Sequence, residues 1–258
     1  MDFSDKTVLI TGASSGIGAA CAEAFAQGGA DLVLAARRMD RLEAAAADLC
    51  TRFEIEVRIA AVDVRSRDVV DAFGADLEAD GVNIDILVNN AGLARGLAPV
   101  HEGDVADWDE MIDTNVKGLL NVTRTIVRGM VDRGEGHVIN IGSIAGHETY
   151  ANGVVYCATK HAVAAITRGL GIDTLGTGVR VSSVDPGLVN TEFSVVRFHG
   201  DQERADGVYA GMTPLSARDV ADAVLFCASR PAHANVREMV LMPADQAAAV
   251  YVHRDENR

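Results

Sequence analysis

The feature that most constrains this chain is a regular alternation of short β-branched runs with longer alanine-rich stretches. The runs predict strands and the longer stretches predict helices near 16–28, 39–52, 67–80, 107–133, 153–176 and 217–229. The expected strands are Thr7–Thr11, Asp31–Ala36, Val57–Val62, Asp85–Asn89, Gly136–Ile141, Arg180–Val184 and Arg237–Leu241. Several are continuously apolar, as expected where helices cover both faces of a parallel sheet. The pattern therefore predicts a doubly wound, three-layer α/β fold.

The chain is expected to form one domain over residues 1–258, since no repeat, linker or low-complexity tract divides it. One segment, 187–211, interrupts the alternation because it is long and mixed in character. It follows the sixth expected strand. In open α/β sheets, ligands bind beyond the carboxyl ends of the strands. We therefore expect a substrate lid near 187–211, with an ordinary surface excursion as the alternative.

Composition excludes several classes of partner. A formal net charge of −14 argues against a nucleic-acid partner, and an anionic ligand would need a local basic site. No apolar run approaches the roughly 20 residues of a membrane span, and the N-terminus lacks the pattern of a signal peptide. The cysteines and histidines are scattered without metal-ligand spacing. We therefore expect a cytoplasmic protein with no membrane partner and no metal.

A glycine-rich turn joins the first expected strand to a helix. Glycine lets backbone amides approach a pyrophosphate closely, and a helix N-terminus favours the negative charge. The spacing GxxxGxG is weak evidence alone, because a tight strand-to-helix connection also uses glycine. Its position in a βαβ unit favours a dinucleotide site. The predicted contacts are Gly12, Ser14, Ser15, Gly16, Ile17 and Gly18.

The end of the second strand selects the cofactor. NAD sites usually carry an acid there for the ribose 2′-hydroxyl, but this chain has Ala36 followed by Arg37 and Arg38. Two guanidinium groups can bind a 2′-phosphate, and Ser14 and Ser15 could add hydroxyl donors. The alternative is a pair of solvated arginines. The residues favour NADP.

Two further strand ends are expected to contact this cofactor. Asp63, with Val64 beside it, ends the third strand and is placed to bind the adenine amino group. Asn90, Ala91 and Gly92 follow the fourth strand, where small residues let the backbone pass close to a ligand. Ordinary turn chemistry is the alternative for both.

Three residues form a candidate proton-transfer group. Ser143 follows the fifth strand, and Tyr156 and Lys160 lie at i and i+4 on the next helix, so they share one face. A lysine ammonium ~4 Å from a phenol at an effective dielectric of ~20 favours the phenolate by ~4 kcal/mol. We therefore expect Lys160 to lower the pKa of Tyr156, which acts as the general acid/base while Ser143 orients the substrate oxygen.

Asn115 lies inside the expected helix 107–133, where asparagine is a poor helix former. It is expected to hold a water that links Lys160 to bulk solvent. A helix-distorting side chain with no chemical role is the alternative.

Together these residues resemble the short-chain dehydrogenase/reductase family over essentially the whole chain. The matching pieces are Thr11–Gly18, Asp63, Asn89–Gly92, Asn115, Ser143, Tyr156, Lys160 and Pro186-Gly187. The resemblance implies a Rossmann fold with a mainly parallel seven-stranded sheet and an Asn–Ser–Tyr–Lys tetrad. It also implies a homotetramer built from helices 107–133 and 153–176. Contacts to the cofactor are implied for Tyr156, Lys160, Pro186, Gly187, Val189 and Thr191.

The C-terminal third is similar to the NADP-dependent 3-hydroxy acid dehydrogenases, notably at Gly187–Val189, Thr191–Ser194 and Val196–Phe198. This resemblance implies oxidation of serine, allo-threonine or a related small hydroxy acid. Two enzyme alternatives remain: an NADPH-dependent aldehyde or ketone reductase, including sulfoacetaldehyde reductases, and a 3-oxoacyl reductase. A third alternative is an NADP-sensing protein without turnover.

An anionic substrate would need a cation in a protein this acidic. Arg197 in the expected lid and Arg95 beyond the Asn-Ala-Gly turn are the candidates. His147 and Tyr150 lie near Ser143 in the sequence and could add hydrogen bonds. Solvated surface positions are the alternative for both arginines.

Overall fold

The computed structural model describes residues 1–255 of the chain, and within them the strands form one parallel seven-stranded sheet of order β3-β2-β1-β4-β5-β6-β7. The strands are β1 (Thr7–Thr11), β2 (Asp31–Ala36), β3 (Val57–Ala61), β4 (Ile86–Asn89), β5 (Gly136–Ile141), β6 (Val179–Pro186) and β7 (Glu238–Leu241). All seven expected strands are present: β1, β2 and β5 have the expected ends, and the other four differ by one or two residues at one or both ends. The predicted doubly wound α/β fold is confirmed.

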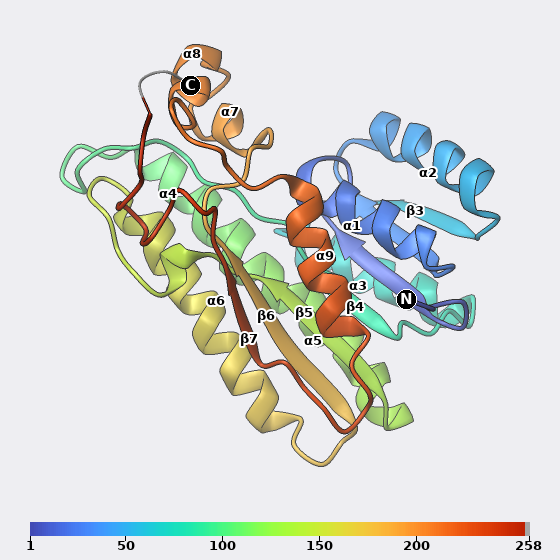
Figure 1. Ribbon diagram of the computed structural model, residues 1–258. Coiled ribbons are helices and arrows are strands. Elements are labelled where there is room, and N and C mark those ends of the chain that lie inside the picture. The colour runs from blue at the N-terminus through green and yellow to red at the C-terminus, as the bar shows by residue number, and fades with distance from the viewer. Residues whose placement is uncertain (256–258) are drawn as a thin grey trace.

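Helices cover both faces of this sheet, giving three layers (Figure 1). One apolar core joins the sheet to α1 (Gly16–Gln27), α2 (Met39–Phe53) and α9 (Ala217–Ala228). A second core joins the other face to α3 (Arg67–Ala79) and α5 (Leu119–Arg133). The remaining helix of this layer is α6 (Val154–Asp173), which packs against β6.

The order of the strands reverses between β1 and β4. The crossovers after β1 and after β4 run in opposite directions, so the carboxyl ends of these two strands border an open crevice. The glycine turn after β1 and the Asn-Ala-Gly turn after β4 meet there. This edge of the sheet therefore holds the expected site.

The expected helix 107–133 is interrupted. The structure has α4 (Val105–Ile112), a π-helical segment (Asp113–Gly118) and then α5. Single π-helical turns within α-helices commonly lie at functional sites. The uniform α-helical prediction was wrong here, and the side chain of Asn115 within this segment bonds to the loop after β4.

The segment 187–211 contains two short helices, α7 (Phe193–Arg197) and α8 (Gln202–Gly207). Both lie at the end of the molecule beyond the carboxyl edge of the sheet (Figure 1). A backbone hydrogen bond from the Gly96 amide to the Arg197 carbonyl, 2.9 Å long, ties this segment to the chain after β4. The segment thus lies where a cover for the crevice is expected.

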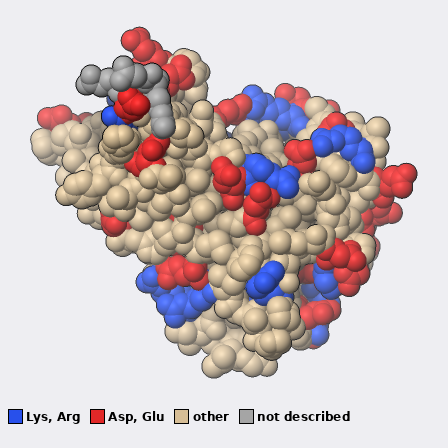
Figure 2. All heavy atoms as spheres, in the orientation of Figure 1, with Lys and Arg blue, Asp and Glu red and all other residues tan. Residues whose placement is uncertain are grey.

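Charged side chains of both signs are interspersed over the face shown in Figure 2, which offers no broad basic surface. This distribution agrees with the formal net charge of −14. Among residues 1–255, no helix has the length and apolar character needed to cross a membrane.

Candidate active site

A cleft of about 770 Å³ opens at the carboxyl ends of the strands, and most of the predicted site residues line it. Those on its cofactor side are Gly12, Ser14, Ser15, Gly16, Ile17, Arg37, Arg38, Asp63, Val64, Asn90, Ala91, Gly92, Pro186, Gly187, Val189 and Thr191. Those on its catalytic and substrate side are Arg95, Ser143, Tyr150, Tyr156, Lys160 and Arg197. Three predicted residues, Gly18, Asn115 and His147, do not line it.

In the glycine turn, Gly12 and Gly18 leave no room for a side chain. Gly12 has φ +66°, and a Cβ there would lie 2.9 Å from Nδ2, the side-chain amide nitrogen of Asn90. That nitrogen donates to the carbonyls of Thr11 at 2.9 Å and Gly12 at 3.2 Å, which fixes the turn against the loop after β4. A Cβ on Gly18 would lie 2.5 Å from the Gly12 carbonyl oxygen, so Gly18 permits close packing behind the turn. The turn and the start of α1 together form a cradle that fits a pyrophosphate.

Arg38 lies over this turn. Its guanidinium donates to Ser14 Oγ at 3.0 and 3.1 Å and to Ser15 Oγ at 2.6 Å. Arg37 is more exposed and lies 3.9 Å from the Glu110 carboxylate. Ala36 beside them is buried and carries no charge. The serine hydroxyls and the guanidinium thus gather at one point of the cleft wall, as a 2′-phosphate site requires.

Asp63 lines the cleft, but its carboxylate is bonded to Arg65 at 2.5 Å. Hydrogen bonding to Arg65 lowers the pKa of Asp63. The carboxylate is therefore ionised and can accept from an amino group while it keeps Arg65. Its contact with adenine stays a prediction.

Ser143, Tyr156 and Lys160 come together at the base of the cleft. Ser143 begins a short 3₁₀ turn, and its Oγ accepts from the Ala145 amide at 3.1 Å. Tyr156 and Lys160 are both buried on α6, with Lys160 Nζ 6.0 Å from the centre of the Tyr156 ring. Lys160 Nζ donates to the Ile141 carbonyl at 2.9 Å.

The predicted effect of Lys160 on Tyr156 is not seen in this arrangement. Burial raises the pKa of Tyr156 well above its ordinary value, and the nearby Tyr150 adds to the rise. Hydrogen bonding with Ser143 and the charge of Arg197 act in the opposite direction. Burial also lowers the pKa of Lys160 to about 8, against the charge of Asp185. Desolvation is therefore the largest influence on the pKa of both groups, because both side chains are buried.

Asn115 lies behind the cleft wall. Its Oδ1 accepts from the Leu93 amide at 2.8 Å, and its Nδ2 donates to the Leu93 carbonyl at 2.8 Å and to Thr159 Oγ1 at 3.0 Å. The side chain therefore joins the loop after β4 to α6, one residue from Lys160. The water relay predicted for Asn115 stays a prediction.

The guanidinium of Arg197 lies beside Tyr156, the predicted general acid/base. It lies 5.4 Å from the Tyr156 ring centre and donates to the Tyr150 hydroxyl at 2.7 Å. Its Nε donates to the Gly96 carbonyl at 3.2 Å. Among residues 1–255, no carboxylate forms an ion pair with Arg197.

Arg95, the other candidate cation, is committed elsewhere. It lines the cleft, but its Nε lies 2.6 Å from the Glu110 carboxylate and its Nη1 donates to the Val196 carbonyl at 2.5 Å. Its charge is therefore balanced within the protein. The structure favours Arg197 over Arg95 as the partner of an anionic substrate.

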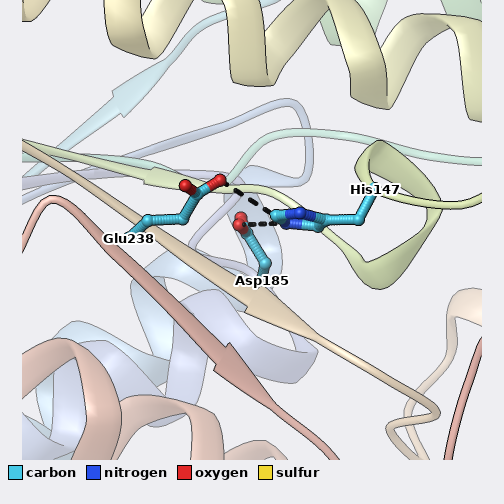
Figure 3. A group of neighbouring side chains, drawn as sticks. All are labelled: His147, Asp185 and Glu238. Atoms are coloured by element: carbon cyan, nitrogen blue, oxygen red, sulfur yellow. Dashed lines mark hydrogen bonds and ion pairs between the residues drawn. The ribbon is translucent and has the colours of Figure 1, made fainter.

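The prediction that His147 faces the substrate was wrong. Figure 3 shows its ring directed at Asp185 and Glu238, and its Nε2 lies 2.7 Å from Asp185 and 3.7 Å from Glu238. Asp185 is buried on β6, where a carboxylate needs hydrogen-bond partners, and it has two of them, Ser183 and His147. Closeness to Ser143 in the sequence did not reveal this orientation.

These three side chains also form a group that could hold a metal ion, since their ligand atoms all lie within 4.8 Å of one another. No sequence spacing predicts this group, because its members come from three separate elements. Its members already have protein partners: His147 bonds Asp185 at 2.7 Å, and Arg168, from outside the group, bonds Glu238 at 2.8 Å.

The ion pairs of Glu192, near the cofactor side, were not predicted from the sequence. Glu192 lines the cleft and lies 3.0 Å from Arg38 and 2.7 Å from Arg41. The partners are separated by about 150 residues, so no local spacing reveals the contact. Glu192 is one of four acids within 187–211, so composition did not single it out.

Comparison with known proteins agrees with this geometry. A family model for short chain dehydrogenases matches residues 6–201. The NADP-dependent 3-hydroxy acid dehydrogenase YdfG of Salmonella typhi is 46% identical over 249 residues, covering 96% of this chain and 99% of that protein. Sulfoacetaldehyde reductase 2 of Chromohalobacter salexigens is 44% identical over 250 residues, covering 96% and 98%.

A solved structure, the closed form of serine dehydrogenase complexed with NADP⁺, is also similar. It superposes with a TM-score of 0.89 at 45% identity and covers 96% of this chain and 100% of that one. The resemblance inferred from the sequence is confirmed: this chain belongs to the short chain dehydrogenase family.

Proposed function

We propose that this protein is an NADP-dependent oxidoreductase that interconverts a small 3-hydroxy acid, such as serine or allo-threonine, and its carbonyl form. The names of the similar dehydrogenases support this activity. The observation that carries the proposal is the position of Arg197 beside the buried Tyr156, since Arg197 pairs with no carboxylate among residues 1–255. An anion bound by Arg197 would have its hydroxyl-bearing carbon near the catalytic phenol.

NADP would lie along the cofactor side of the cleft. The glycine turn and the start of α1 would hold its pyrophosphate, and Arg38 with Ser14 and Ser15 would hold its 2′-phosphate. Asp63, Asn90–Gly92 and Pro186–Thr191 would line the rest of it. When bound, NADP⁺ would supply the acceptor for the hydride that leaves the hydroxyl-bearing carbon, and its oxidised nicotinamide would add a positive charge to the site.

Tyr156 would take the hydroxyl proton during oxidation and return it during reduction. Its pKa is raised by burial in the protein alone, so the charges that would favour the phenolate are Arg197, Lys160 and the bound cofactor. Ser143 would bind and orient the substrate oxygen. Lys160, held on the Ile141 carbonyl, would pass protons toward solvent through a water near Asn115.

The test follows NADP⁺ reduction spectroscopically with L-allo-threonine and with NAD⁺ as the comparison cofactor. We expect turnover with NADP⁺ and much weaker turnover with NAD⁺. Binding of NADP⁺ without turnover of any hydroxy acid would refute the substrate assignment while leaving the cofactor assignment intact.

The Arg197→Met variant tests the substrate assignment more sharply. It should raise KM for an anionic hydroxy acid by about 10- to 100-fold, the effect of losing a charge-assisted hydrogen bond. KM for a neutral alcohol of similar size should change little. Equal effects on the two substrates would contradict the role of Arg197.

A second candidate activity is reduction of a small anionic aldehyde. It is favoured by the similarity to a sulfoacetaldehyde reductase, since a sulfonate would also suit Arg197. NADPH oxidation with sulfoacetaldehyde that is faster than NADP⁺ reduction with any hydroxy acid would establish this reading. A 3-oxoacyl reductase is less well supported, because a charged arginine lies where an apolar chain would pass.

We also propose a cytoplasmic homotetramer in which each chain is one domain with a lid near 187–211. The support for association is a set of exposed apolar side chains on the helices of one layer: Val105, Ile112, Leu120, Val131, Val154 and Ile172. Sedimentation equilibrium would test this proposal, and a monomeric mass at micromolar concentration would contradict it.

A further inference from the structure

Glu192 joins the lid segment to the cofactor side of the cleft. It immediately precedes α7, and its two carboxylate oxygens lie 3.0 Å from Arg38 Nη1 and 2.7 Å from Arg41 Nη1. Both arginines belong to the start of α2, on the other side of the cleft mouth. This carboxylate therefore bridges the two sides.

Arg38 serves two kinds of partner at once. Its Nε and Nη2 face Ser14 and Ser15, while its Nη1 faces Glu192. A guanidinium can bind a phosphate with a pair of parallel donors, so the same group is the expected ligand of the 2′-phosphate. The carboxylate of Glu192 already accepts a hydrogen bond from Nη1 of this guanidinium.

The ion pairs of Glu192 can exchange. The side chains of Glu192, Arg38 and Arg41 are 46%, 41% and 43% exposed, so water competes for each of them. Exposed ion pairs contribute little to stability. A phosphate carries a charge of about −1.5 to −2 near neutral pH and would repel a carboxylate held beside it.

The place of this acid is also informative. Sites for NAD carry an acid at the end of the second strand, and this chain has Ala36 there. The lid supplies an acid to the same corner of the cleft from a position more than 150 residues away. That corner therefore contains both the cations that attract a 2′-phosphate and an anion that opposes it.

We infer that Glu192 is a specificity-determining residue that holds the lid segment on Arg38 and Arg41 and competes with the cofactor 2′-phosphate for them. The inference rests on the proposed use of NADP. The lid segment thereby has a second role. Its contact with α2 forms when Glu192 is bound to Arg38 and is lost when the 2′-phosphate is bound there. Removal of the Glu192 charge should strengthen binding only of ligands that carry a 2′-phosphate.

The experiment is calorimetric titration of wild-type and Glu192→Gln proteins with 2′,5′-ADP and with 5′-AMP. We expect Glu192→Gln to bind 2′,5′-ADP about two- to fivefold more tightly, the effect of an exposed charge pair, with 5′-AMP affinity unchanged. Glu203→Gln is the matched control, because it removes the same charge from an exposed position in α8. It should leave both affinities unchanged.

Hydrogen–deuterium exchange at Phe193–Arg197 gives a second readout. In the wild type, 2′,5′-ADP should speed exchange there relative to 5′-AMP, and Glu192→Gln should exchange faster without ligand. Unchanged or weaker 2′,5′-ADP binding in Glu192→Gln, or an equal gain in Glu203→Gln, would overturn the inference.

The two proposals fail differently. If wild-type protein prefers 2′,5′-ADP to 5′-AMP and Glu192→Gln does not increase that preference, only the inference falls. If neither protein prefers 2′,5′-ADP, the NADP assignment falls as well. If only Glu192→Gln shows the preference, Glu192 opposes the phosphate as inferred and the NADP assignment of the wild type is refuted.

Discussion

The two sides of the cleft are held by different means. At the glycine turn, the cofactor side depends on close packing, as where Gly12 and Gly18 meet Asn90 of the loop after β4. The substrate side depends on arginines that bond to backbone carbonyls of other segments, such as Arg95 to Val196 and Arg197 to Gly96. Changes on the first side should therefore alter stability and cofactor choice, whereas changes on the second should alter substrate affinity and leave the fold intact.

Tyr156 lies where the two sides meet, so its loss should separate chemistry from binding most clearly. Tyr156→Phe should reduce kcat by about 10²- to 10⁴-fold, the usual effect of losing a general acid/base. NADP⁺ affinity should stay within about twofold, because the phenol ring is kept and only its hydroxyl is lost. Stopped-flow turnover and fluorescence titration would measure the two quantities. A large loss of NADP⁺ affinity would contradict the separation.

Substitution of Arg38 tests whether residues of the cofactor side alone determine the preference for NADP⁺ over NAD⁺. Arg38→Gln should weaken NADP⁺ binding by about 10- to 100-fold through loss of charge-assisted hydrogen bonds, with little effect on NAD⁺. Arg37→Gln is the matched comparison and should have the smaller effect, since Arg37 makes no hydrogen bond to either serine. Equal effects of the two substitutions would mean that Arg38 has no special position.

Glycine substitutions test the difference in packing directly. Gly18→Ala places a Cβ 2.5 Å from the Gly12 carbonyl and should lower the free energy of unfolding by about 1–3 kcal/mol. Gly207→Ala in α8 meets nothing within 4 Å and should be neutral or slightly stabilising. Urea unfolding of both variants provides the comparison. Similar losses would show that the lid is packed as tightly as the turn.

Lys160 gives the smallest effect, and it depends on pH. Its pKa is about 8 in the folded protein against 10.5 ordinarily, so the unfolded chain binds this proton more tightly. Stability therefore rises with pH between those values, and the buried ammonium lowers stability below pH 8. Lys160→Met should raise the free energy of unfolding at pH 7 by about 1–2 kcal/mol, a gain that shrinks toward pH 10.5.

Urea unfolding at pH 7 and pH 10 measures this difference. Arg168→Met, a half-exposed position on the same helix, should show no comparable dependence on pH. The same gain for Lys160→Met at both pH values would contradict the assignment to a buried ammonium.

Sequence predicted the fold well because its determinants are local. The strands repeat a simple apolar pattern, and Gly12, Ser143, Tyr156 and Lys160 each follow a strand end or share a helix face. Such residues meet wherever parallel strands end at one edge of a sheet. The structure accordingly brings all four to one cleft.

The features that sequence did not predict depend on partners far along the chain. His147 turns toward Asp185 because a buried carboxylate on β6 needs a partner. Glu192 meets Arg38 and Arg41 across the cleft, and neither arginine lies near it in sequence. Orientation and pairing of this kind follow from the assembled fold, and a single sequence carries no record of them.

The π-helical segment before α5 has a consequence for which changes the chain tolerates. A π turn holds one more residue than an α turn for the same full rotation, so the face that α5 presents to the sheet is kept across the segment. Deleting one residue from Asp113–Gly118 should therefore restore a regular helix and leave the apolar face of α5 buried. The deletion should instead displace Asn115 and break its bonds to the Leu93 backbone. The segment thus allows one side chain to reach the loop after β4 without disturbing the core, and a deletion there should affect the cleft more than stability.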